Sequence, residues 1–287
     1  MLRIEYDEGA RNSHNACRDG RAPNERTLQV RVAAQCLQIH YGEVLASEML
    51  FAAVAMDNAS HKTHWLLPLV LSITAGSVDV IGFLSLGGLF TAHITGNLVI
   101  LAVHYVTGRF GELGPLLSVP VFVAVLGLVA LTFGASERPR ASRRALLVLH
   151  AFLLAAFLGI GVWLGPFNNA DSGPAVCVGM LGVSAMATQN ALVRLVLPGS
   201  PTTAVMTTNT TQLTIDFATL IRKRAGPEER AKARKGASAT FPPVLGFIIG
   251  CASGALLYTR LGFSALALPL ILAILAIPLG EFWSDAS

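Results

Sequence analysis

Charged residues are scarce in this chain: they make up 13% of its 287 residues, whereas a soluble globular domain carries roughly 25%. The scarcity is uneven, because residues 1–64 hold seven basic and eight acidic side chains and the much longer remainder holds only 23 charged ones. Hydrophobic residues account for 53% of the sequence. This composition argues against an ordinary soluble domain. It predicts an all-α, polytopic membrane protein preceded by a polar N-terminal extension over residues 1–64.

Cysteine is also rare, and no two of the four cysteines form a C-x-x-C pair. A disulfide framework or a zinc site is therefore not expected. Walker A, H-E-x-x-H and G-x-S-x-G motifs are absent from the sequence. We therefore expect no metal, no cofactor and no ATP-driven chemistry. The basic runs have no interleaved aromatic residues, so nucleic-acid binding is not expected either.

The polar N-terminal extension holds no apolar stretch of signal-peptide quality next to a basic start. Met49 and Met56 both precede the first strongly apolar stretch. We interpret part of residues 1–55 as an upstream extension without a function of its own. Met56 is then an alternative start.

A transmembrane helix needs roughly 20 mostly apolar residues. Six stretches meet this requirement clearly or nearly so: Leu66–Leu86, Leu116–Ala135, Ala145–Leu164, Ala175–Leu197, Phe241–Tyr258 and Phe263–Phe282. Thr91–Thr107 and Thr202–Ile221 are ambiguous, because both contain polar, threonine-rich sequence. The prediction is a transmembrane helix bundle with six strong spans plus two polar or broken membrane segments.

Two basic clusters favour six crossings over eight. One cluster lies at residues 138–144 and the other at residues 222–235. Short cytoplasmic loops carry an excess of lysine and arginine. Six crossings would put both clusters and both termini in the cytoplasm, whereas eight crossings would put the clusters on opposite sides. Non-helical backbone at membrane depth must be buried in protein or line water, so the two ambiguous segments are expected inside the bundle.

Two polar hexapeptides suggest an internal repeat. Residues 92–97 read AHITGN and residues 204–209 read AVMTTN. The expected halves, residues 65–164 and 174–282, are followed by a tail at 283–287. Each half contains three strong spans, an odd number, so the repeats would be inverted, as in many secondary transporters.

Each half also presents a polar helix face. Asn97 and His104 lie at i and i+7 on one face, and Asn209 and Asp216 repeat that spacing. Asp79 is the other acid deep in apolar sequence, where ionisation is costly. The candidate solute or ion pathway comprises Asp79, His93, Thr95, Gly96, Asn97, His104, Gln189, Asn190, Thr207, Asn209, Gln212 and Asp216. A helix break near Gly87, Gly88 and Gly96 would add free backbone amides and carbonyls to this site.

The same regions resemble a known family. The residues that carry the resemblance are Ala75-Gly76, Asp79, Gly82-Phe83, Leu86-Gly87-Gly88, Phe90, Thr95-Gly96-Asn97, Gln189-Asn190-Ala191, Val193-Arg194, Thr202-Thr203 and Thr207–Thr211. They are similar to the signature of the YoaK-like family of bacterial multi-pass membrane proteins, a domain of unknown function, over roughly residues 64–282. Thr208 departs from the glycine expected at its position. The resemblance implies a bacterial inner (plasma) membrane location and supplies no activity.

The leading functional hypothesis is a secondary transporter or facilitator of a small polar solute, with proton coupling as an option and the lipid bilayer as its surroundings. The alternatives are a structural or regulatory membrane subunit, in which the polar residues only clasp helices, and an intramembrane enzyme that uses Asp79, His93 and His104 as acid–base groups. Gly246, Gly250 and Gly254 form a small-residue ridge that would suit packing within the bundle or a homo-oligomer.

Overall fold

The structure is a computed structural model that describes residues 65–108, 113–135, 138–204, 206–222 and 224–283. The chain divides into two units, Met1–His61 and Lys62–Ser287. The second unit contains all the described residues. The predictions about residues 1–64, including the alternative start at Met56, lie outside the described residues.

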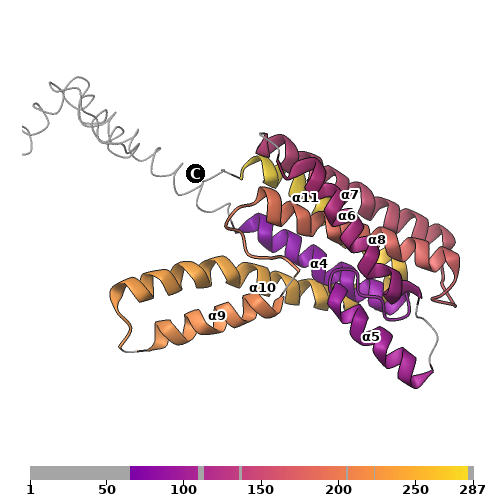
Figure 1. Ribbon diagram of the computed structural model, residues 1–287, viewed down its shortest axis with the longest axis horizontal. Helices are drawn as coiled ribbons and strands as arrows, with labels where there is room; N and C mark the ends of the chain where they lie inside the picture. The colour runs from indigo at the N-terminus through magenta and orange to yellow at the C-terminus, as the bar shows by residue number, and fades with distance from the viewer. Residues whose placement is uncertain (1–64, 109–112, 136–137, 205, 223, 284–287) are drawn as a thin grey trace, which may run out of the picture. The chain divides into compact units, whose positions relative to one another are not determined.

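The described residues form helices and no strand, as an all-α bundle requires. In chain order these are α4 (Leu66–Ser85), α5 (Ile94–Thr107), α6 (Leu113–Phe133), α7 (Pro139–Leu164), α8 (Gly173–Val196), α9 (Met206–Ile221), α10 (Pro227–Leu261), the short 3-10 helix η1 (Gly262–Leu266) and α11 (Ala267–Glu281) (Figure 1). Five helical stretches are long and apolar enough to cross a membrane: α4, α6, α7, α8 and the continuous run from α10 to α11. The prediction of a polytopic helical bundle is therefore confirmed.

Helices α4 and α8 are the most buried of these stretches. Helix α10 packs closely along α4. A Cβ atom added at Gly250 would collide with the backbone of Ile73, and one added at Gly246 would come within 2.7 Å of the Leu69 carbonyl oxygen. The glycine ridge of α10 is thus occupied by α4 within a single chain, because only residues without a side chain allow this approach. An oligomer would need another surface.

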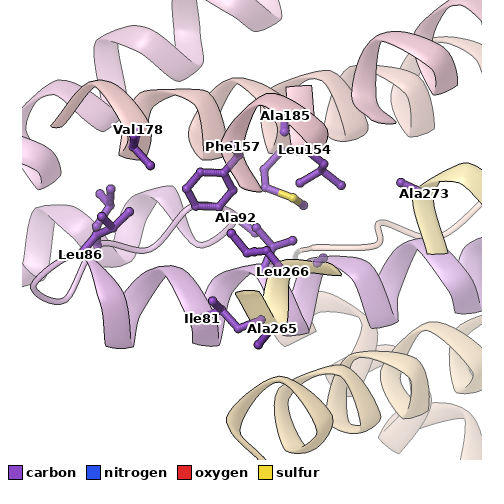
Figure 2. Packing of buried hydrophobic residues seen from close by; sticks show 14 of the residues in the cluster. Ile81, Leu86, Ala92, Leu154, Phe157, Val178, Ala185, Ala265, Leu266 and Ala273 are labelled. Atoms are coloured by element: carbon purple, nitrogen blue, oxygen red, sulfur yellow. The ribbon is translucent and has the colours of Figure 1, made fainter. Parts of the chain in front are cut away.

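Helix α8 is covered by α6 and α7, and α11 packs on both α4 and α7. The apolar core between them includes Phe157 of α7, Val178 of α8 and Leu266 of η1, all almost fully buried. Figure 2 shows these side chains converging from the different helices. The ring of Phe157 also packs edge-on against Phe263, at a centroid distance of 5.3 Å. This core fixes the positions of the helices that carry the polar residues.

Specific hydrogen bonds join the ends of different helices. Asp171, before α8, accepts a hydrogen bond from the Leu113 amide at the start of α6 (3.0 Å). Tyr258, near the end of α10, donates to the Leu84 carbonyl near the end of α4 (3.3 Å). The buried Arg143 near the start of α7 donates to carbonyl oxygens at the end of α11.

The two ambiguous segments form short helices. Helix α5 has 14 residues and α9 has 16, which correspond to lengths of about 21 and 24 Å. Both are shorter than a hydrocarbon core of about 30 Å. Helix α10, by contrast, is longer than its apolar part, because it begins at Pro227 and carries the later part of the second basic cluster, residues 230–235, in its first turns. Proline at the first helical position and Glu228 and Glu229 in the first turn favour a helix start there.

Candidate functional site

The connection between α4 and α5 is a tight turn followed by an extended segment. Gly87 and Gly88 both have positive φ values, of 65° and 92°. A residue with a side chain would be strained at either position, so the two glycines let the chain leave α4 and double back. The segment 89–93 then runs beside α4 until α5 begins at Ile94. The helix break expected from these glycines is therefore present.

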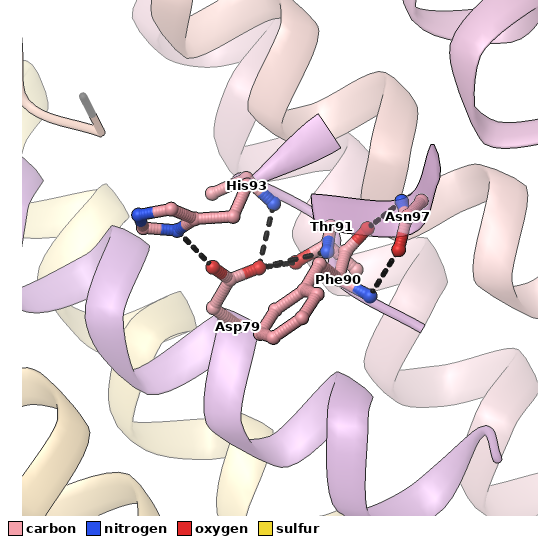
Figure 3. A network of polar contacts seen from close by, with 6 residues as sticks. Asp79, Phe90, Thr91, His93 and Asn97 are labelled. Carbon is pink, nitrogen blue, oxygen red and sulfur yellow. Dashed lines mark hydrogen bonds and ion pairs between the residues drawn. The ribbon is translucent and has the colours of Figure 1, made fainter. Parts of the chain in front are cut away.

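Asp79 holds this connecting segment in place (Figure 3). Its Oδ1 atom accepts hydrogen bonds from the Thr91 and Ala92 amides, both at 2.7 Å, and from the Thr91 hydroxyl at 3.2 Å. Its Oδ2 atom contacts His93 Nδ1 at 2.5 Å. Asp79 is only 3% exposed, so its carboxylate depends on these four partners in place of water. We call Asp79, Thr91, Ala92 and His93 the first clasp.

His93 connects the first clasp to its surroundings. Its side chain is 37% exposed, whereas that of Asp79 is almost fully buried. The imidazole ring also packs edge-on against Phe247 of α10, at a centroid distance of 5.2 Å. The pair thus combines a buried acid with a partly exposed base, an arrangement that can pass a proton between the interior and the exterior.

Asn97, one turn into α5, folds back on the same segment. Its side chain accepts from the Phe90 amide (2.9 Å) and donates to the Phe90 carbonyl (2.7 Å). It also donates to Ser118 of α6 (2.8 Å). One side chain thus forms hydrogen bonds with both the amide and the carbonyl of the Phe90 backbone. The segment is held at both ends, by Asp79 from α4 and by Asn97 from α5.

A second set of polar contacts joins α8 to the segment before α9. The fully buried Gln189 of α8 donates from Nε2 to the Thr203 hydroxyl and to the Leu71 carbonyl of α4, both at 2.9 Å. Asn209 of α9 folds back on Thr202, donating to its carbonyl at 2.5 Å and accepting from its hydroxyl at 3.4 Å. We call Gln189, Thr203 and Asn209 the second clasp.

The correspondence extends to sequence spacing. Thr91 and Thr203 are separated along the chain by the same interval as Asn97 and Asn209. Asp79 lies six residues before the end of α4 and Gln189 seven residues before the end of α8, about 9 and 10 Å along each helix. Each clasp therefore ties the end of a buried long helix to the start of a short one. They differ in chemistry, because only the first contains a carboxylate and an imidazole.

A third polar group lies between α9 and α10. Asn209, Leu213 and Asp216 are the buried residues of α9, as their i, i+4, i+7 spacing indicates. Asp216 Oδ1 accepts from Gln212 (2.9 Å), and Oδ2 lies against Gly236 of α10 without a hydrogen-bond partner. On α5 the corresponding residues Leu101 and His104 are half-buried. Each short helix thus turns this face toward its own neighbour, α5 toward α6 and α9 toward α10.

The other predicted site residues make no side-chain hydrogen bond to these groups. Thr95 and Thr207 are exposed on the first turns of α5 and α9. Asn190 donates to the Met186 carbonyl of its own helix (2.9 Å). Gly96 packs against the ring of Phe90, where an added Cβ would lie 3.0 Å from the ring. The twelve predicted residues therefore fall into three polar groups and several single positions.

His150 and Arg143 are among the buried polar residues that were not predicted from the sequence. His150 of α7 is completely buried and contacts the Ala185 carbonyl through Nδ1 (2.9 Å), and its Nε2 has no hydrogen-bond partner. Arg143, which the sequence places in a basic loop cluster, is 1% exposed. Its position one turn into α7 was the available signal, because a cation there can reach the carbonyl end of a neighbouring helix. Across the helices that the structure describes, no three His, Cys, Asp or Glu residues are grouped as a metal site.

Comparison with known proteins shows the family to which this chain belongs. The family model described as "Protein of unknown function (DUF1275)" matches residues 67–278, which include both clasps. The chain belongs to this family. It is also similar to the UPF0700 transmembrane protein YoaK of Bacillus subtilis (strain 168), with 39% identity over 100 residues. That match covers 31% of this chain and 40% of YoaK, so it spans less than half of the relative. No solved structure matches.

Proposed function

We propose that the chain is a secondary transporter or facilitator of a small polar solute, with the two clasped segments as its moving parts. The observation that carries the proposal is the presence of two matching clasps, each at the junction of a buried long helix and a short one. Discontinuous helices at such junctions are a recurring feature of transporters, because their free backbone groups can bind a solute and their short halves can move.

The internal repeat belongs to this proposal. Helix α10 packs on α4 as α6 packs on α8, and α11 packs on α4 as α7 packs on α8. When α4, α5, α6 and α7 are matched in this order with α8, α9, α10 and α11, each main packing contact has a counterpart. With three long helices in each half, six crossings make the repeats inverted, so that α4 and α8 run in opposite directions. The first clasp then lies nearer the side that carries Asp171, and the second lies nearer the basic clusters.

Proton coupling would act through Asp79. A proton on this carboxylate removes its charge and weakens its bonds to the Thr91 and Ala92 amides, because hydrogen bonds to an ionised acceptor are roughly twice as strong as neutral ones. The titratable groups that face Asp79 are His93 in the segment itself and the Cys251 thiol on α10. Protonation would therefore loosen the first clasp and release the start of α5.

Flux measurements on reconstituted protein test the proposal. Proteoliposomes would be exposed to inward gradients of glycerol, urea or alanine, with light scattering to follow solute entry and an internal pH dye to follow protons. We expect flux of at least one probe above that of empty liposomes. Asp79→Asn should abolish the accompanying proton movement, because the amide keeps the shape of the side chain and loses its charge. Equal proton movement with Asp79→Asn would refute the coupling role.

The matched control is Asp171→Asn. Asp171 also accepts a backbone amide bond, from Leu113, yet it lies in a partly exposed loop. Its replacement should leave both solute and proton flux unchanged. An equal loss of proton flux in both variants would indicate a general effect of removing an acid and not a pathway through Asp79.

A structural role is the second candidate, and the completeness of the first clasp favours it. Both carboxylate oxygens of Asp79 are hydrogen-bonded within the chain, as expected of a side chain that only fixes helix packing. In that case no probe would cross faster than in empty liposomes. Asp79→Asn would then lower the melting temperature in detergent without any effect on transport.

A further inference from the structure

We propose that the two clasps are paired gates of unequal strength, and that the neutral Gln189 clasp opens more often than the charged Asp79 clasp. This inference rests on the proposed function for its meaning as gating, although opening itself is measurable without transport. It assigns Gln189, Thr203 and Asn209 a role as positioning residues for the second gate. It also makes Gln189 the counterpart of Asp79.

The first argument is the difference in hydrogen bonding. The first clasp directs four donors onto one carboxylate, and two of them are backbone amides at 2.7 Å. In the second clasp, α8 makes one contact with the segment, from Gln189 to the Thr203 hydroxyl at 2.9 Å, and Asn209 of α9 adds two hydrogen bonds to Thr202. Because hydrogen bonds to an ionised group are roughly twice as strong as neutral ones, the first clasp is the stronger in both number and kind.

The second argument is an unsatisfied acceptor in the second clasp. Gln189 is fully buried, and its Nε2 atom bridges Thr203 and the Leu71 carbonyl, whereas its Oε1 atom has no partner. If the side-chain amide were flipped, its oxygen would face the Leu71 carbonyl oxygen, and two acceptors cannot form a hydrogen bond. The observed orientation is therefore the one that the contacts require. A buried acceptor without a donor raises the free energy of the closed state. The closed second clasp is therefore less stable, and opening would let water or a solute donor reach Oε1.

Two alanines at matching positions can be replaced by cysteine to measure the opening of each clasp. Ala92 follows Thr91 and is 8% exposed, and Ala204 follows Thr203 and is 2% exposed. A cysteine at either position is small and stays hidden while its clasp is closed. In a variant with Cys17, Cys36, Cys177 and Cys251 replaced by serine, the rate of maleimide labelling at Ala92→Cys or Ala204→Cys would measure how often each segment opens. Purified protein in detergent makes both sides accessible.

We expect Ala204→Cys to be labelled at least about tenfold faster than Ala92→Cys, the difference that corresponds to one strong hydrogen bond. Asp79→Asn should accelerate labelling at Ala92→Cys by a similar factor and leave Ala204→Cys unchanged. Gln189→Ala should accelerate labelling at Ala204→Cys alone. The control is Asn190→Ala, since this neighbouring amide bonds only to its own helix and should change neither rate.

Ala273→Cys serves as a reporter of unfolding, because Ala273 is fully buried on α11, which carries no residue of either clasp, and should remain unlabelled. If Gln189→Ala exposes that reporter, Thr203→Val replaces it, since valine keeps the shape of threonine and removes only the hydroxyl. Labelling of Ala92→Cys as fast as that of Ala204→Cys, or equal effects of Gln189→Ala and Asn190→Ala, would overturn the inference. Labelling in the expected order without solute flux would support unequal opening and count against the transporter proposal instead.

Discussion

Single side chains that satisfy backbone groups are the smallest units of this structure. Asn97 meets both the amide and the carbonyl of Phe90 and still reaches Ser118 on α6. Backbone groups outside a helix have no partner of their own, and at membrane depth water is not available to replace one. One asparagine therefore helps a stretch of non-helical chain to lie within a helical bundle.

We expect Asn97→Ala to destabilise the protein. The substitution leaves the Phe90 amide and carbonyl without their partner, at a cost of about 1–3 kcal/mol for each unsatisfied group. Thermal unfolding in detergent, followed by circular dichroism, should show a clearly lower midpoint. Thr95→Ala is the control, because Thr95 is exposed two residues earlier on the same helix. Equal midpoints for the two variants would contradict this account.

At the scale of helices, close packing between α4 and α10 depends on glycine. An added Cβ at Gly250 would meet the Ile73 backbone, which cannot move as a flexible side chain can. At Gly127 on α6, by contrast, no atom lies within 4 Å of an added Cβ. Gly250 belongs to the small-residue ridge that the sequence shows, whereas Gly127 stands between larger apolar residues.

Gly250→Ala should therefore separate α4 from α10 and lower the free energy of unfolding by about 1–3 kcal/mol, the usual cost of overpacking. Gly127→Ala should be neutral or slightly stabilising, because alanine is the better helix former by about 1 kcal/mol. Denaturation in detergent with increasing sodium dodecyl sulfate would measure both. A stabilising effect of Gly250→Ala would show that the two helices are not in this contact.

Features of single helices that depend on local sequence were predictable. The spacing of Asn209, Leu213 and Asp216 predicts the buried face of α9, since helical periodicity is a local property. The glycines of residues 86–88 predict a helix break for the same reason.

The tertiary partners of these residues were not predictable from the sequence. Gln189 bonds to a carbonyl 118 residues away, and the hydrophobic pattern contains no information about such pairs. Helix α10 extends beyond its apolar part because its basic turns pack against α9, which apolar length alone does not indicate.

At the scale of the whole molecule, hydrogen bonds pair the ends of different helices, and we propose six crossings as the topology of the chain. The contact of Asp171 with Leu113 joins the starts of α8 and α6, and the contact of Tyr258 with Leu84 joins the ends of α10 and α4. The contacts of Arg143 with Gly280 and Trp283 join the start of α7 to the end of α11. The short helices α5 and α9 then contribute no crossing. In this proposal both basic clusters would face the same compartment, as expected from the tendency of positive charge to remain inside.

Cysteine accessibility in intact cells tests this topology. In the variant with the four native cysteines replaced, Asn168→Cys in the α7–α8 loop should react with a membrane-impermeant maleimide. Ala141→Cys and Lys232→Cys, one in each basic cluster, should react only after the cells are permeabilised. All three positions are exposed, so accessibility depends on the side of the membrane alone. Opposite behaviour of the two basic-cluster positions would indicate eight crossings.

The short chain distance within the first clasp has a consequence for biosynthesis. Asp79 lies only 12–14 residues from its partners, so the clasp can close as soon as the α4–α5 region has left the ribosome. The main packing partners of α4, which are α10 and α11, are the last helices of the chain to be synthesised. During that interval the carboxylate would otherwise meet lipid or the insertion machinery as a bare charge. We predict that the first clasp stabilises its own helix during this interval, so its loss should reduce the yield of inserted protein.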